Sequence, residues 1–240
     1  MEILFLTVLT FLAGIVGTIT GFGISTIMVP VVLLFLPLPE TLLLVGVIHW
    51  FGDIWKMYFF KHGFDAKLLF FFALPGIIMA YIGARMALTL PEVLLSRFVG
   101  LILLVYIVYL FFKPDFKLKD NMLTAGIGGA GSGFLGGISG VGGGALRSVV
   151  LTAFNLPKSA YIFISGLTGF AIDASRISTY FLGGVRINHS LTLGLLAFIP
   201  ASFLGAWIAK KIVNRIPQAK FRTVISMFLL LIGLKFLIFP

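Results

Sequence analysis

The sequence predicts an all-α integral membrane protein made of two inverted repeats, each with a glycine-broken helix pair plus three spanning helices. Composition gives the first reason: of 240 residues, 60% are hydrophobic and 11% are charged, whereas a soluble domain carries about 25% charged residues. A glycine-rich motif that occurs twice is the second reason. The placement of basic residues in short loops is the third, and it explains the net charge of +10 without a nucleic-acid partner.

The glycine motif defines the repeat. Residues 14–23 read G-I-V-G-T-I-T-G-F-G, and residues 133–142 read G-F-L-G-G-I-S-G-V-G. Four glycines and one hydroxyl residue recur 119 positions later: Gly14, Gly17, Thr20, Gly21 and Gly23 correspond to Gly133, Gly136, Ser139, Gly140 and Gly142. Helix breaks at corresponding positions of two apolar halves are typical of secondary transporters.

The correspondence continues beyond the glycines. Asp53 and Lys56 recur 120 positions later as Asp173 and Arg176, and Pro75 recurs 125 positions later as Pro200. A polar stretch, K-P-D-F-K-L-K-D-N, separates the two halves. The chain therefore divides into a first transmembrane repeat, 1–112, a cytoplasmic linker, 113–121, and a second transmembrane repeat, 122–240.

Each half is expected to open with an apolar helix that ends at its glycine break. A full span needs about 20 residues, so the segment after each break is too short for an ordinary crossing. These opening pairs cover 3–20 with 24–37, and 122–138 with 141–155. The three spanning helices that follow cover 40–60, 66–88 and 93–112, then 157–182, 190–213 and 219–239.

Basic residues in the loops predict the orientation. If each broken pair enters and leaves on one face, the most basic loops share a side, which the positive-inside rule makes cytoplasmic. Those loops contain Lys61, Lys67, Lys113, Lys117, Lys119, Lys210, Lys211, Arg215, Lys220 and Arg222. Each half then makes an odd number of effective crossings, which inverts one half relative to the other. The pattern does not distinguish re-entrant hairpins from pairs of short full spans.

The glycine breaks are candidate binding sites. A helix that starts after a break presents unpaired N–H groups and a partial positive charge, which suit an anion. Two such helix starts converging near the midplane would form one anion pocket. The residues expected to bind substrate are Thr20, Gly21, Gly23, Ser25, Ser139, Gly140, Gly142, Gly143, Gly144 and Arg147. The alternative is that these glycines only let helices approach closely.

Five charged residues lie in or beside apolar segments, where an ionised group is costly and usually functional. Asp53 with Lys56 and Asp173 with Arg176 have i,i+3 spacing, so each acid can bridge to its base. They are interpreted either as helix-end ion pairs at the membrane interface or as gating or coupling groups at the two mouths of a pathway. Arg147 corresponds to Met28 and is expected to contact the anion, with snorkelling to the interface as its alternative.

The sequence gives no sign of catalysis or of a resident metal. It contains no cysteine, and it has none of the common hydrolase, nucleotide-binding or zinc motifs. The three histidines show no metal-ligand spacing with each other or with carboxylates. His49 is interpreted as a packing residue, with membership of the Asp53 network as the alternative. We expect no enzyme activity, no cofactor and no metal site.

With both glycine motifs, the duplicated organisation and the length, the chain resembles the sulfite exporter TauE/SafE family over essentially its whole length. The resemblance implies a secondary carrier for sulfite, thiosulfate, organosulfonates or related small anions, in the cytoplasmic membrane. Pro30 of the first motif has Val149 opposite it, so the two half-sites need not be equivalent.

Two other functions stay open from the sequence. A passive anion channel would conduct without saturation, and a membrane scaffold would tolerate neutralisation of its internal charges. Proton coupling through Asp53 or Asp173 and a homodimeric state are also left open. Alternating access around a midplane site is the leading mechanism, since two related halves can move relative to each other.

Overall fold

The computed structural model describes residues 2–61, 65–89, 121–154 and 156–217, together with Lys220 and Met227. These ranges form eight α-helices and contain no strand. The expected last span of each half, 93–112 and 219–239, lies outside them apart from two single residues, as does the linker apart from Asn121. The described part confirms the all-α prediction.

The eight helices follow the expected segments closely. Asp65, Asn121 and Asn188 cap three of them by accepting a backbone N–H. The helices of the first half are α1 (Glu2–Thr20), α2 (Ser25–Val32), α3 (Leu38–Phe59) and α4 (Ala66–Ala87), and those of the second are α6 (Met122–Ser139), α7 (Gly142–Ala153), α8 (Lys158–Leu182) and α9 (His189–Arg215). Four of them, α1, α3, α4 and α9, are long and apolar enough to cross a membrane.

The two halves repeat in local detail. Gly21 and Gly140 follow the ends of α1 and α6 with φ of 77° and 69°, a left-handed conformation that glycine adopts without steric cost. Just before them, the hydroxyls of Thr20 and Ser139 each donate to the carbonyl four residues back and accept the amide two residues on. These matching contacts show why the motif keeps a hydroxyl before its third glycine.

Each short helix folds back along the helix before it. The rings of Phe5, near the start of α1, and of Phe35, in the turn after α2, lie 6.0 Å apart, while Gly23 N donates to Gly17 O at 3.1 Å beside the break. Ser132 Oγ on α6 likewise donates to Gly143 O at 2.7 Å. At 8 and 12 residues, α2 and α7 are as short as the sequence predicts.

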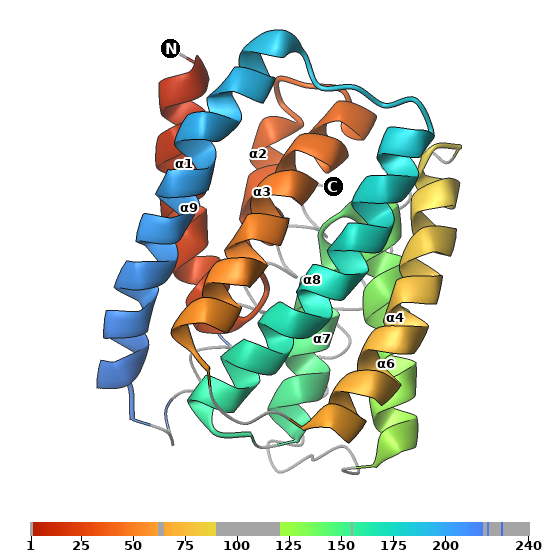
Figure 1. Ribbon diagram of the computed structural model, residues 1–240, viewed down its shortest axis with the longest axis vertical. Helices are drawn as coiled ribbons and strands as arrows, with labels where there is room; N and C mark the ends of the chain where they lie inside the picture. The colour runs from red at the N-terminus through yellow and green to blue at the C-terminus, as the bar shows by residue number, and fades with distance from the viewer. Residues whose placement is uncertain are drawn as a thin grey trace.

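The halves pack on each other through two helix pairs that the repeat relates to each other and through one central crossing. α1 lies on α9 and α4 lies on α6, while α3 crosses α8 at the centre. At that crossing, Trp50 and Phe170, which are 120 positions apart, stack at 4.8 Å. Figure 1 shows α3 descending where α8 rises, and α4 rising where α9 descends.

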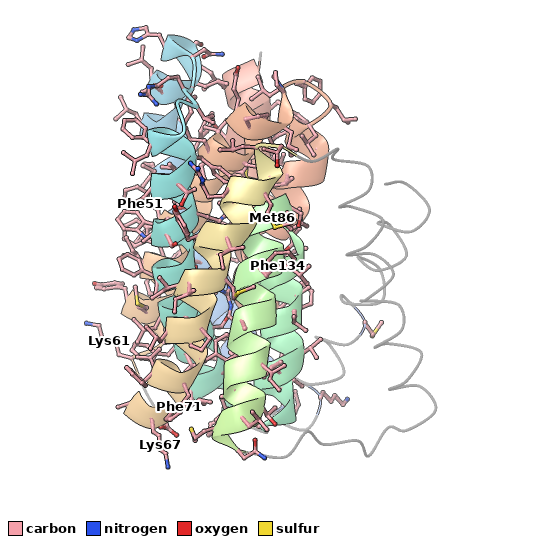
Figure 2. All side chains as sticks on the ribbon, turned by 90° about the vertical axis from the view of Figure 1, so that its right-hand side faces the viewer. Phe51, Lys61, Lys67, Phe71, Met86 and Phe134 are labelled. Carbon is pink, nitrogen blue, oxygen red and sulfur yellow. The ribbon has the colours of Figure 1, made fainter. Side chains whose placement is uncertain are left out.

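The exterior and the ends of the bundle suit a bilayer. Phe70, Phe71, Ile78 and other large apolar side chains are exposed, and Figure 2 shows Phe71 projecting outward. In the same view Lys67 lies at the lower end and Lys61 above it in the lower half, and α9 also ends low in the bundle (Figure 1). The described basic residues at the end of α3, the start of α4 and the end of α9 therefore lie toward the same end of the bundle.

The packing of α4 on α6 can be tested at Gly133, which lies directly against the backbone of α4 at Gly76. A Cβ there would overlap Gly76 O, whereas a Cβ on Gly126 of the same helix would come no closer than 3.7 Å to Phe71 O. We expect Gly133→Ala to lower the thermal unfolding midpoint in detergent clearly. Gly126→Ala should leave it unchanged or raise it, since alanine favours a helix by about 1 kcal/mol over glycine. Equal midpoints for the two variants would contradict this packing.

Candidate functional site

The two glycine breaks meet at the centre of the bundle. Ser148 Oγ on α7 and the Tyr161 hydroxyl on α8 both donate to Thr20 O, at 3.2 and 2.6 Å. Thr26 Oγ1 on α2 donates to Val141 O at 3.3 Å. No side chain caps the start of α2 or of α7. The convergence expected from the sequence is therefore present, with both helix starts in the protein interior.

Close packing accounts for several of the glycines expected to bind substrate. A Cβ on Gly143 would overlap Ser132 O, and a Cβ on Gly144 would overlap Phe22 O of the other break. A Cβ on Gly23 would overlap the His49 imidazole. At all three positions the lack of a side chain lets a neighbouring backbone or side chain come close. This is the alternative in which the glycines serve helix packing rather than substrate binding. Gly142 opens α7 and is buried.

The two acid–base pairs lie in one buried cluster. Lys56 Nζ is 2.7 Å from Asp53 Oδ1, and Arg176 Nε is 2.7 Å from Asp173 Oδ1. His49 joins them, with Nε2 at 3.6 Å from Asp53 Oδ1 and Nδ1 at 3.0 Å from Asp173 Oδ2. All five side chains are buried. The placement of the pairs at the interface or at two separate mouths is therefore wrong.

His49 is also not an ordinary packing residue. Its Nδ1 lies 2.9 Å from Ser25 Oγ at the start of α2, which places that expected substrate contact beside the imidazole. Sequence reasoning favoured packing, the commoner role of a lone histidine in an apolar segment. The spacing to Asp53, four residues along α3, was the available signal, and membership of its network is the interpretation that the structure supports.

Arg147 reaches from the second half to the break of the first. Its Nε donates to Ser165 Oγ at 3.2 Å, and Ser165 Oγ donates to Gly21 O at 2.7 Å. The side chain is 2% exposed, so it does not snorkel to the surface. Its other guanidinium nitrogens lie at Gly169, where an added Cβ would be 2.8 Å from Nη1 and would overlap Asp53 Oδ2.

Arg176 occupies the equivalent place at the second break. A Cβ on Gly140 would lie 3.3 Å from its Nη1. Near it, the Tyr180 hydroxyl donates to Gly137 O on α6. Sequence reasoning did not single out Ser165, Tyr161 or Tyr180, because polar residues scattered along an apolar helix carry no pattern.

Electrostatics of the described cluster favour an anion. It holds three bases, Lys56, Arg147 and Arg176, against two acids, Asp53 and Asp173, and so carries one net positive charge while His49 is neutral. Among the described residues, Nη2 of Arg147 and both Nη atoms of Arg176 have no hydrogen-bond partner, and neither do Oδ2 of Asp53 and Oδ2 of Asp173. Buried guanidinium donors without partners are costly, and an oxyanion is the ligand that satisfies them in pairs.

The same cluster contains the one carboxylate–histidine group that distance alone would allow to hold a metal within the described ranges. One ligand atom each from His49, Asp53 and Asp173 lies within 4.8 Å of the others. Sequence spacing did not reveal this group, because its members come from two helices. Lys56 and Arg176 already contact the two carboxylates, and Arg147 adds a third fixed positive charge. A divalent cation is therefore disfavoured electrostatically.

Comparison with known proteins gives one positive finding. A family model described as "Sulfite exporter TauE/SafE" matches residues 6–236, which includes both breaks, the buried charges and every described helix apart from the start of α1. No curated protein and no solved structure matches the chain. The match agrees with the resemblance carried by the glycine motifs.

Proposed function

The chain belongs to the sulfite exporter TauE/SafE family, and from this premise we propose that it is a secondary transporter moving a small sulfur oxyanion across the cytoplasmic membrane by alternating access. The family and the four apolar helices make it a multi-pass membrane protein. The family is one of transporters rather than of enzymes.

One observation carries the choice of substrate site: the buried guanidinium of Arg147 beside the α1–α2 break. Ser165 fixes Nε, which leaves Nη2 without a partner inside a net positive cluster. A planar guanidinium donates two parallel bonds to a pair of anion oxygens. Sulfite, thiosulfate and sulfonates all present such a pair, with a compact charge that suits a closely packed interior.

The architecture supports alternating access. Corresponding helices of the two halves run in opposite directions, α3 against α8 and α4 against α9 (Figure 1). This is what inverted halves require, and the anion site lies where they cross. In an inverted-repeat carrier, movement of one half about such a central site opens it first to one side and then to the other. Asp53, Lys56, Asp173 and Arg176 would then be coupling groups at the substrate site itself.

The test is flux into proteoliposomes that contain only this protein. We expect uptake of sulfur-35-labelled sulfite or thiosulfate that saturates with concentration and is accelerated by unlabelled anion on the other side. Conductance that neither saturates nor shows counterflow would assign a channel. Absence of flux for sulfite, thiosulfate and small sulfonates alike would reject the proposed function.

A further inference from the structure

His49 is a buried titratable group that anion binding alone does not use. Its Nδ1 faces Ser25 Oγ at 2.9 Å and Asp173 Oδ2 at 3.0 Å. Its Nε2 has no hydrogen-bond partner among the described residues and faces Asp53 Oδ1 at 3.6 Å. The imidazole thus lies between two carboxylates that belong to different halves of the chain.

The surroundings of Asp53 and Asp173 in the two halves can be compared residue by residue. Each carboxylate has its own base three residues on and, from the opposite half, a second nitrogen-bearing side chain nearby. For Asp53 that second side chain is Arg147, whose Nη atoms and Asp53 Oδ2 both border the space at Gly169. For Asp173 it is His49. The repeat relates the places of these two side chains. His49 corresponds to Gly169 in the second half, and because glycine has no side chain, the Arg147 guanidinium fills the space at Gly169.

The two equivalent positions differ in chemistry. Arginine keeps its charge at any physiological pH, whereas histidine gains or loses a proton near neutral pH. Within the described ranges, the charged members of the cluster around His49 are Asp53 and Lys56 on its own helix, Asp173 and Arg176 on α8, and Arg147 on α7. α2 contributes only hydroxyl and apolar side chains.

We propose that His49 binds a proton that is carried together with the anion, so that the protein is an anion–proton symporter. The inference rests on the proposed transport function and assigns its coupling ion. Water on the open side supplies the proton to the imidazole, and the same proton leaves to water on the other side after the halves have moved. The protonated ring turns Nε2 into a donor toward Asp53.

The charge of the cluster couples the binding of the proton to the binding of the anion. Protonation of His49 raises the net charge of the cluster from one to two positive charges and so strengthens anion binding. Linkage is reciprocal: an anion that binds more tightly to the protonated state must also favour protonation by the same factor. With one linked proton, the anion affinity falls tenfold for each pH unit over the range in which binding takes up that proton.

The experiment measures proton uptake on anion binding by the purified full-length protein in weakly buffered detergent solution. Thiosulfate is the probe, because sulfite itself titrates near neutral pH and would mask the signal. We expect wild-type protein to take up as much as one proton per thiosulfate, with an affinity that falls tenfold per pH unit at alkaline pH. His49→Gln should bind with pH-independent affinity and no proton uptake. His189→Gln, an exposed histidine at the start of α9, is the matched control.

Each outcome decides the matter. Wild-type binding without proton uptake would overturn the inference while leaving the transport function intact, as would proton uptake that persists in His49→Gln. If His49→Gln does not fold, the affinity slope and the uptake of the wild-type protein still decide. Absence of binding for thiosulfate, sulfite and sulfonates would instead reject the proposed function on which the inference rests.

Discussion

Replacing Arg147 by methionine is expected to weaken anion binding by about 10- to 100-fold while the protein stays folded. Methionine is the residue that the first half carries at the corresponding position, where Met28 is fully buried, so the fold already accommodates it. A charge-assisted hydrogen bond contributes about 1.5–3 kcal/mol, and each 1.4 kcal/mol is tenfold in affinity. Equilibrium binding of sulfur-35-labelled thiosulfate measures the loss.

The matched control is Arg186→Met. Arg186 is a loop residue whose guanidinium bonds the Phe181 and Val185 carbonyls, and its removal should leave binding unchanged. Thermal unfolding of both variants separates binding from folding. Normal affinity in Arg147→Met would mean that the anion binds elsewhere, and a loss of equal size in both variants would mean that general charge, not position, determines binding.

Neutralising only one member of the Asp53–Lys56 pair is expected to destabilise the protein strongly. Both side chains are 0% exposed, and Asp53→Asn leaves the Lys56 ammonium buried near Arg147 without its counter-charge. Breaking a buried ion pair costs about 3–5 kcal/mol. The unfolding midpoint in detergent should fall well below that of wild type. Asp65→Asn is the control, since asparagine caps a helix about as well as aspartate.

Removing both charges together separates stability from function. Asp53→Asn combined with Lys56→Met should recover most of the stability, because no unpaired charge is left in the interior. We expect the double variant to assemble in the membrane yet to transport poorly, since the cluster loses its coupling pair. A double variant with full transport would contradict a functional role for the pair and would favour a purely structural one.

Much of the fold could be predicted from residue patterns alone. The matching glycines and hydroxyls located both breaks to within a few residues, because a left-handed backbone position and a shortage of apolar length are properties of local sequence. Pro75 and Pro200 lie inside α4 and α9 as their correspondence indicates. Arg147 could be singled out because a lone arginine in an apolar segment needs a partner.

The meeting of the two acid–base pairs could not be predicted in the same way. Residues on one helix reveal their mutual spacing, but the crossing of α3 over α8 decides whether Asp53 and Asp173 lie together or apart. The inversion suggested by the loop charges favoured opposite ends, yet the packing of α3 against α8 brings both pairs to His49. His49 was undervalued for a related reason, since its contact with Asp173 depends on the packing of α3 against α8.

The central claim is that the anion binds at the buried cluster where the two breaks meet, and its position can be measured directly. Selenite has the shape and charge of sulfite, and selenium scatters X-rays anomalously, so crystals equilibrated with selenite reveal where the anion lies. The account predicts one strong anomalous peak within hydrogen-bonding distance of the Arg147 guanidinium, beside Ser165 and the α1–α2 break. Peaks confined to the basic loops at the ends of the helices, with none at Arg147, would contradict it.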